Sequence, residues 1–172
     1  MISIKVNKFN VRSTLLVGVV LIAVLILGAI LGRSGTAANR VLVKVAYSKK
    51  LKTRILVTAN GHTLYLWALD AGGKPTCYND STYHCSQAWR PLRSSETPLA
   101  GRGVKASWLK TVRRTDGVAQ ITYRGHPLYT DAGSPADGLK PDTKRGDVNG
   151  QGFYDWYAVS AMGAPIHKLP QG

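Results

Sequence analysis

Short runs of apolar, β-branched and aromatic residues, broken by turn-forming residues, fill the chain beyond residue 40. In the run 64–67, leucines alternate with aromatic residues, which is the period of a strand with two different faces. Asn60-Gly61 and Asp116-Gly117 are strong turn signals between runs. Helical periodicity is weak, with single helical turns expected at most around residues 87–89 and 107–110. Strands are expected at residues 41–47, 54–59, 63–68, 118–123, 126–129 and 156–160.

One surface motif occurs twice in this β region. Residues 61–65 read Gly-His-Thr-Leu-Tyr and residues 125–129 read Gly-His-Pro-Leu-Tyr, and each copy follows an expected strand. A repeated motif after a repeated strand indicates one structural unit built twice. The sequence therefore predicts an all-β domain, a small sandwich or open barrel made of two related β units.

The N-terminal part has a different pattern. Residues 15–32 contain no polar side chain, and Lys5, Lys8 and Arg12 precede them. A bilayer span needs about 20 apolar residues, whereas the apolar part of a cleavable signal has about 7–15. We therefore expect one transmembrane helix that remains as an anchor, although the small residues 36–38 leave cleavage and secretion open.

This pattern divides the chain into four parts. We expect a basic tail at 1–14, an anchor or signal segment at 15–32, a linker at 33–40 and a β-repeat domain at 41–172. The domain is expected outside the cytoplasmic membrane, as part of a single-pass protein. Basic residues also follow the apolar run, which by the positive-inside rule alone would favour the opposite orientation.

The net charge of the chain indicates which kind of partner the domain could bind. The chain has 23 basic and 9 acidic residues; 18 basic and all 9 acidic residues lie beyond residue 40, which gives the domain a net charge of 18 − 9 = +9. Such a surface favours anionic surroundings, so anionic envelope components are candidate partners. Nucleic acid is not expected, because no recognised nucleic-acid-binding motif is present. The sequence does not indicate an oligomeric state.

Cys77 and Cys85 are the only cysteines. In an exported protein, two cysteines close in sequence predict a disulfide. The alternative is a metal site that also uses His84, although the spacing matches no common zinc pattern.

Motifs for catalysis are missing. The sequence has no nucleophile elbow, no His-Glu-x-x-His and no phosphate-binding glycine loop. We therefore expect neither an enzyme nor a cofactor. One segment partly resembles a calcium loop but lacks the final bidentate glutamate; its candidate ligands are Asp147, Asn149, Gln151 and Asp155.

The first copy of the repeat also carries an aromatic and acidic group. Tyr65 and Trp67 lie on one face of the expected strand, and Asp70 follows three residues later. Such a shelf could bind a sugar, a quinone or a cation. A packed aromatic strand whose aspartate closes a turn explains the same residues and is the interpretation that we favour.

At these residues the chain resembles a bacterial family of secreted repeat proteins, often described as predicted lipoproteins, whose function is unknown. The resemblance includes the Tyr-x-aromatic-x-x-Asp motif at 65–70, the segment 85–92, the second copy from 114 to Tyr129, and the closing segments 146–152 and 156–157. The second copy departs from the motif, with Asp131 and Ser134 at the aromatic and acidic positions and an extension at 136–145. No lipidation cysteine is present.

The resemblance implies a location and an architecture, without an activity. We expect a membrane-anchored or secreted cell-envelope β domain that acts as a binding or structural module. The alternative is an envelope redox- or metal-linked protein that uses Cys77, Cys85 and His84.

Overall fold

Strands make up most of the regular structure. The computed structural model describes residues 40–79 and 84–170. Its strands are β1 (Leu42–Ser48), β2 (Thr53–Thr58), β3 (Tyr65–Trp67), β4 (Trp89–Pro91), β5 (Leu99–Ala100), β6 (Leu109–Arg113), β7 (Ala119–Tyr123), β8 (His126–Pro127), β9 (Tyr129–Asp131) and β10 (Trp156–Ala158). The helical elements are short: α2 (Cys85–Ala88) and the 3₁₀ turns η1 (Ala71–Gly73), η2 (Ala106–Trp108) and η3 (Pro135–Asp137). The prediction of a mostly β chain is confirmed.

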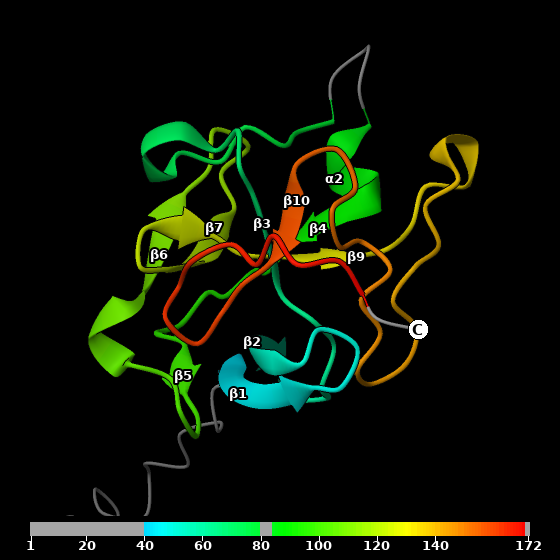
Figure 1. The fold of residues 1–172 in the computed structure, drawn as a ribbon. Helices are drawn as coiled ribbons and strands as arrows, with labels where there is room; N and C mark the ends of the chain where they lie inside the picture. The colour runs from blue at the N-terminus through cyan, green and yellow to red at the C-terminus, as the bar shows by residue number, and fades with distance from the viewer. Residues whose placement is uncertain (1–39, 80–83, 171–172) are drawn as a thin grey trace, which may run out of the picture. The chain divides into compact units, whose positions relative to one another are not determined.

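The strands form three sheets, with the orders β2-β1-β5, β10-β3-β9-β4 and β6-β7-β8 (Figure 1). All pairings are antiparallel except that of β1 with β5. The described residues, 40–79 and 84–170, belong to one compact unit.

Most predicted strands are present within a few residues of the expected bounds. The exception is the expected strand 126–129, which is divided. Its first part, β8, pairs with β7, whereas Tyr129 begins β9 in the neighbouring sheet. Strands β4, β5 and β6 were not predicted. Strands β4 and β5 are short and pair with strands distant in sequence, whereas β6 carries polar residues on an exposed face and pairs with β7, the next strand along the chain.

The two repeat hairpins differ in their loops. Arg124 and Gly125 form a two-residue turn with φ angles of 50° and 85°, both in the left-handed region, as a type I′ turn requires. In the first copy, Thr58 and His62 bond to each other across a three-residue loop that ends at Gly61, with φ 88°. The Asn60-Gly61 signal thus predicted a hairpin correctly but not its loop length.

Strand β3 lies between two hydrophobic cores. Tyr65 belongs to a core that also contains Trp89, Tyr129 and Trp156, hereafter the aromatic core. Leu64 and Leu66 belong to a second, largely aliphatic core with Ile121 and Leu128. The alternation in residues 64–67 therefore separates two buried environments, because a strand presents successive side chains to opposite faces.

The predicted tail, apolar run and nearly all of the linker lie outside the described residues. Within residues 40–79 and 84–170, no helix has the length and apolar character needed to cross a membrane.

Candidate functional site

The two copies of the repeat meet at their tyrosines. Tyr65 of β3 lies directly opposite Tyr129 of β9 in the antiparallel pair. Outside this central pair, β10 joins β3 with Trp156 opposite Trp67, and β4 joins β9 with Trp89 opposite Asp131. The equivalent tyrosines, 64 residues apart in sequence, are thus neighbours at the middle of one sheet.

Each tyrosine is held by an aspartate from the other copy. The Tyr129 hydroxyl donates to Asp70 Oδ2 at 2.8 Å, and the Tyr65 hydroxyl donates to Asp142 Oδ2 at 2.7 Å. The second oxygen of each carboxylate accepts a backbone N–H a few residues further on: that of Thr76 for Asp70 and that of Asn149 for Asp142. Asp142 therefore has the same role in the second copy as Asp70 has in the first.

The sequence did not identify Asp142. Asp70 follows its tyrosine by five residues, whereas Asp142 follows Tyr129 by thirteen. The extension at residues 136–145 moves the second aspartate along the chain, and Ser134 occupies the position equivalent to Asp70. The only available signal was that the extension contains two aspartates, Asp137 and Asp142, while the motif position has none.

Stacked rings complete the aromatic core. Trp156 stacks on Trp89 at 4.1 Å between ring centroids and on Trp67 at 5.2 Å. Tyr65 meets Trp89 edge-on at 5.3 Å, and Tyr129 meets Trp156 edge-on at 4.9 Å. Edge-to-face and offset pairs of this kind add to the stabilisation from burial. Only Trp67, at the edge, is partly exposed.

Burial changes the acidity of these groups. Burial, followed by the neighbouring carboxylate, raises the pKa of both tyrosines. Burial also raises the pKa of Asp70 and of Asp142, although the tyrosine hydrogen bond acts in the opposite direction. Since Tyr65, Asp70 and Tyr129 are buried and bonded to protein groups, the geometry favours the packed interpretation of the motif over a ligand shelf.

We expect Tyr65→Phe and Tyr129→Phe to destabilise the domain by similar amounts. Each change removes one buried hydrogen bond to a carboxylate, which is worth about 1.5–3 kcal/mol. Chemical denaturation near neutral pH measures the loss. Tyr157→Phe is the control, because the Tyr157 hydroxyl makes only an exposed 3.4 Å contact to Asp155. A neutral effect of either core variant would contradict the equivalence of the two pairs.

The cysteines form the predicted disulfide. Cys77 and Cys85 are bonded, with their Cα atoms 5.3 Å apart. The buried Arg114 binds the carbonyl oxygen of Cys77 at 2.7 Å and so fixes this loop to the β6–β7 hairpin. His84 is exposed. In the described part of the chain, no group of three His, Cys, Asp or Glu residues could hold a metal ion.

The residues of the calcium-like segment bind protein groups instead of facing one centre. Asp147 accepts the backbone N–H groups of Thr143 and Lys144. Gln151 binds the backbone at Ala158 and Ile166, and Asn149 donates to the carbonyl of Pro141. Asp155 has a φ of 65° in the turn before β10. These contacts shape turns, and calcium binding stays an untested hypothesis.

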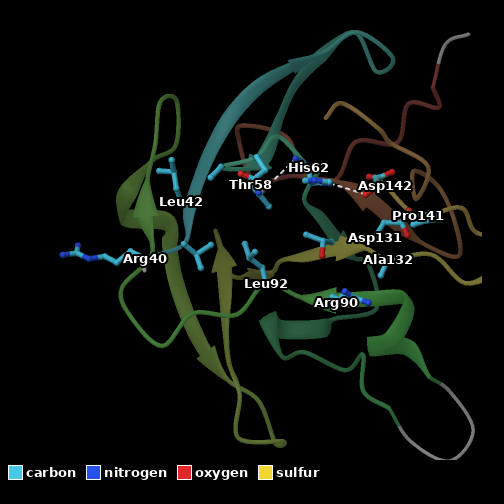
Figure 2. A pocket seen from close by; sticks show the side chains of 14 residues that line it. Arg40, Leu42, Thr58, His62, Arg90, Leu92, Asp131, Ala132, Pro141 and Asp142 are labelled. Carbon is cyan, nitrogen blue, oxygen red and sulfur yellow. Dashed lines mark hydrogen bonds between the residues drawn. The ribbon is translucent and has the colours of Figure 1, made fainter. Parts of the chain in front are cut away.

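A hollow of about 690 Å³ lies beside Asp131 and Asp142 (Figure 2). It is bounded by the start of β1, the β2–β3 loop, β4, β9 and the loop at 141–142. Its charged or titratable residues are Arg40, His62, Arg90, Asp131 and Asp142. His62 is oriented by its Nδ1, which donates to the carbonyl oxygen of Asp142 at 3.2 Å, so the neutral ring keeps Nε2 as an acceptor.

Among the residues that line the hollow, Asp131 is unusual because its carboxyl group is buried. Its side chain is 5 % exposed, and Oδ1 accepts the N–H of Gly133 at 2.7 Å. Oδ2 is buried and has no hydrogen-bond partner among the described residues. Burial is the main cause that raises the pKa of this carboxyl to about 7. A buried carboxyl of this kind is costly for the fold and is more frequent at functional sites than elsewhere.

Sequence patterns pointed to only part of this site. Asp131 was noticed as a departure from the family motif, because it stands where the first copy has Trp67. Nothing in the sequence connected it with Arg40 or Arg90, since the three residues come from three different strands or their flanks.

Comparisons with known proteins do not identify the chain: no protein-family model, curated protein or solved structure matches it. The resemblance to the secreted repeat family therefore stays a prediction that rests on the motifs alone.

Proposed function

We propose that this protein is a membrane-anchored cell-envelope β domain that works as a binding module, and that the hollow beside Asp131 is its ligand site. The single observation that carries the site is the buried Asp131 carboxyl, with one oxygen unpartnered, in the wall of a hollow that also contains two arginines. The proposal includes no catalytic step.

The lining defines the chemistry of the ligand. Arg90 is exposed and offers its guanidinium group to an anion, whereas Arg40 lies at the rim with its guanidinium directed away from the other lining residues (Figure 2). Asp131 contributes a carboxyl group to the wall, although its unpartnered oxygen is itself buried, and His62 offers a ring nitrogen. A small phosphorylated or carboxylated molecule that also carries a hydroxyl or amino group fits this set.

Location and architecture have separate support. The Cys77–Cys85 disulfide fits an oxidising compartment outside the cytoplasm. The apolar run at 15–32 supplies the anchor in this proposal. The paired tyrosines and their reciprocal aspartates support a sandwich-like domain of two related β units. The redox- or metal-linked alternative gains no specific support from the geometry around His84.

Calorimetric titration with glycerol 3-phosphate, inorganic phosphate and acetate tests the site. We expect glycerol 3-phosphate to bind best, because it combines an anionic group with hydroxyl donors. Arg90→Gln should weaken binding by about tenfold or more, equal to about 1.4 kcal/mol. Arg113→Gln is the matched control, because Arg113 is exposed on β6 and does not line the hollow. No binding of any probe, or equal losses in the two variants, would contradict the proposal.

A further inference from the structure

We propose that one face of the domain, on the side of the aliphatic core, docks onto an anionic phospholipid surface. We call it the basic–aromatic face and define it by Tyr47, Arg54, Arg102, Lys105, Trp108 and Arg124. The inference rests on the proposed function, because it assumes that the domain is attached to a membrane.

Residues from the β1–β2 hairpin, the segment between β5 and β6, and the β7–β8 turn build this face, and the segment 156–172 adjoins it. The cross-strand partner of Tyr47 in β1 is Arg54 in β2. The parallel pairing of β1 with β5 brings the next segment alongside, and the carbonyl of Arg102 accepts the N–H of Val45 at 3.0 Å. Figure 1 shows β5 beside the β1–β2 hairpin. Two acid-free segments, 40–69 and 97–115, are thus joined.

Hydrogen bonds connect the rest of the face. The Tyr123 hydroxyl accepts the N–H of Lys105 and donates to the carbonyl of Ala161, whose own N–H binds the carbonyl of Arg54. Arg124 donates to the carbonyl of Met162 at 3.0 Å. These bonds place the contributing segments next to one another.

Its cations are available to a partner. Arg54, Arg102, Lys105 and Arg124 are all exposed. The two salt bridges within the described residues belong to Lys50 and Arg114, which are not members of the face. The other two contributing segments, 117–130 and 156–172, also contain no Asp or Glu. No carboxylate from the four segments can neutralise the charge.

Apolar and aromatic groups stand among these cations. Trp108 has the Lys105 ammonium 4.5 Å from its ring centroid and the Arg124 guanidinium 5.1 Å from it. Tyr47 is 61 % exposed, and Met162 beside Arg124 is 63 % exposed. Basic residues mixed with exposed aromatic and apolar side chains suit the headgroup region, where rings insert and cations meet lipid phosphates.

The short segment between the apolar run and the domain favours a membrane over other polyanions as the partner of this face. Residues 33–39 separate the apolar run from Arg40. Even fully extended, these seven residues span at most about 25 Å. An anchored domain is thus held at the lipid surface, where even a weak basic face is occupied because its effective concentration is high.

The test uses the full chain in liposomes with a fluorescent label at Ser107→Cys, next to Trp108, and headgroup-attached quencher lipids. We expect strong quenching in vesicles with about one third phosphatidylglycerol, and weak quenching in neutral phosphatidylcholine or at high salt. A label at Ala136→Cys, on η3 away from the face, should stay unquenched in both.

Two variants that each lose four positive charges distinguish binding through the basic–aromatic face from binding through the net charge of the domain. Replacing Arg54, Arg102, Lys105 and Arg124 by Gln should remove most of the quenching. Replacing the exposed Arg93, Lys140, Lys144 and Lys168 by Gln should leave it unchanged. Circular dichroism checks that both variants fold. Equal losses in the two variants, equal quenching in neutral vesicles, or binding to free polyphosphate without quenching at anionic vesicles would overturn the lipid assignment.

A reporter fusion after Gly172 tests the anchor and its orientation separately in cells. An active exported reporter supports the location on which the inference rests. A reporter active only in the cytoplasm would refute the proposed location, whatever the vesicle result.

Discussion

Replacing Trp156 with alanine is expected to destabilise the domain by about 3–5 kcal/mol, the usual cost of truncating a buried aromatic residue. Trp156 is 2 % exposed and packs against Trp67, Trp89 and Tyr129 at once. Its removal leaves a cavity in the aromatic core and takes away the ring on which two other tryptophans stack. Chemical denaturation of the purified protein measures the effect.

Two further substitutions, at a partly exposed and at an exposed aromatic residue, test whether the loss of stability depends on burial. Trp67→Ala should lower stability by less, because Trp67 is partly exposed and stacks only on Trp156. Tyr154→Ala should change stability little, because Tyr154 is 74 % exposed. A loss at Trp67 equal to that at Trp156 would show that the edge of the core is as tightly packed as its centre, which the described geometry does not predict.

Asp131→Asn is expected to stabilise the domain above neutral pH. The pKa of Asp131 is raised from 3.8 to about 7 in the folded state. Between about pH 4 and pH 7, this carboxyl is therefore protonated in the folded protein and ionised in the unfolded protein. Stability from this group is therefore present at low pH and is lost as pH rises through 7. The shift corresponds to at most about 4 kcal/mol, and asparagine removes the charge without changing the shape.

Stability curves from pH 4 to pH 9 measure this effect. The variant should show a smaller decline with rising pH than the wild type, because only Asp70 and Asp142 then keep a pKa raised by burial. Asp155→Asn is a control at an exposed carboxylate. Parallel curves for the wild type and Asp131→Asn would show that Asp131 is already ionised without cost in the folded protein.

The same carboxyl connects stability with the proposed binding site. Asp131 Oδ2 is buried, so a ligand bonds to it only if the wall of the hollow opens. A hydroxyl or ammonium group that then reaches it would satisfy the oxygen that lacks a partner. Stabilisation by such a ligand should therefore be larger in the wild type than in Asp131→Asn.

Local sequence patterns gave much of the β structure. Alternation and turn residues located β1, β2, β3, β7 and β10 within a few residues. The repeat predicted equivalent tyrosines, and the cysteine pair predicted the disulfide that the structure contains. These features depend on neighbours in sequence, where strand period and turn chemistry act directly.

Other features depend on contacts between distant segments. The division of residues 126–129 between two sheets is set by their partners, since β8 follows β7 while Tyr129 pairs with Tyr65. The single helical turn expected around residues 107–110 is present as η2 (Ala106–Trp108), but from Leu109 onward the chain forms strand β6, which pairs with β7. The sequence also left the position equivalent to Asp70 in the second copy unassigned.

By itself, the sequence determined a basic, mostly β chain with a duplicated motif, a cysteine pair and an apolar N-terminal run. Only the tertiary structure decided that the duplicated tyrosines face each other, that Asp142 replaces the missing motif aspartate, and that Asp131 lines a hollow with two arginines. The physical reason is that burial and hydrogen-bond partners come from packing between segments far apart in sequence. The same aspartate can therefore cap a turn, bind a tyrosine or remain unpaired, according to what the fold places beside it.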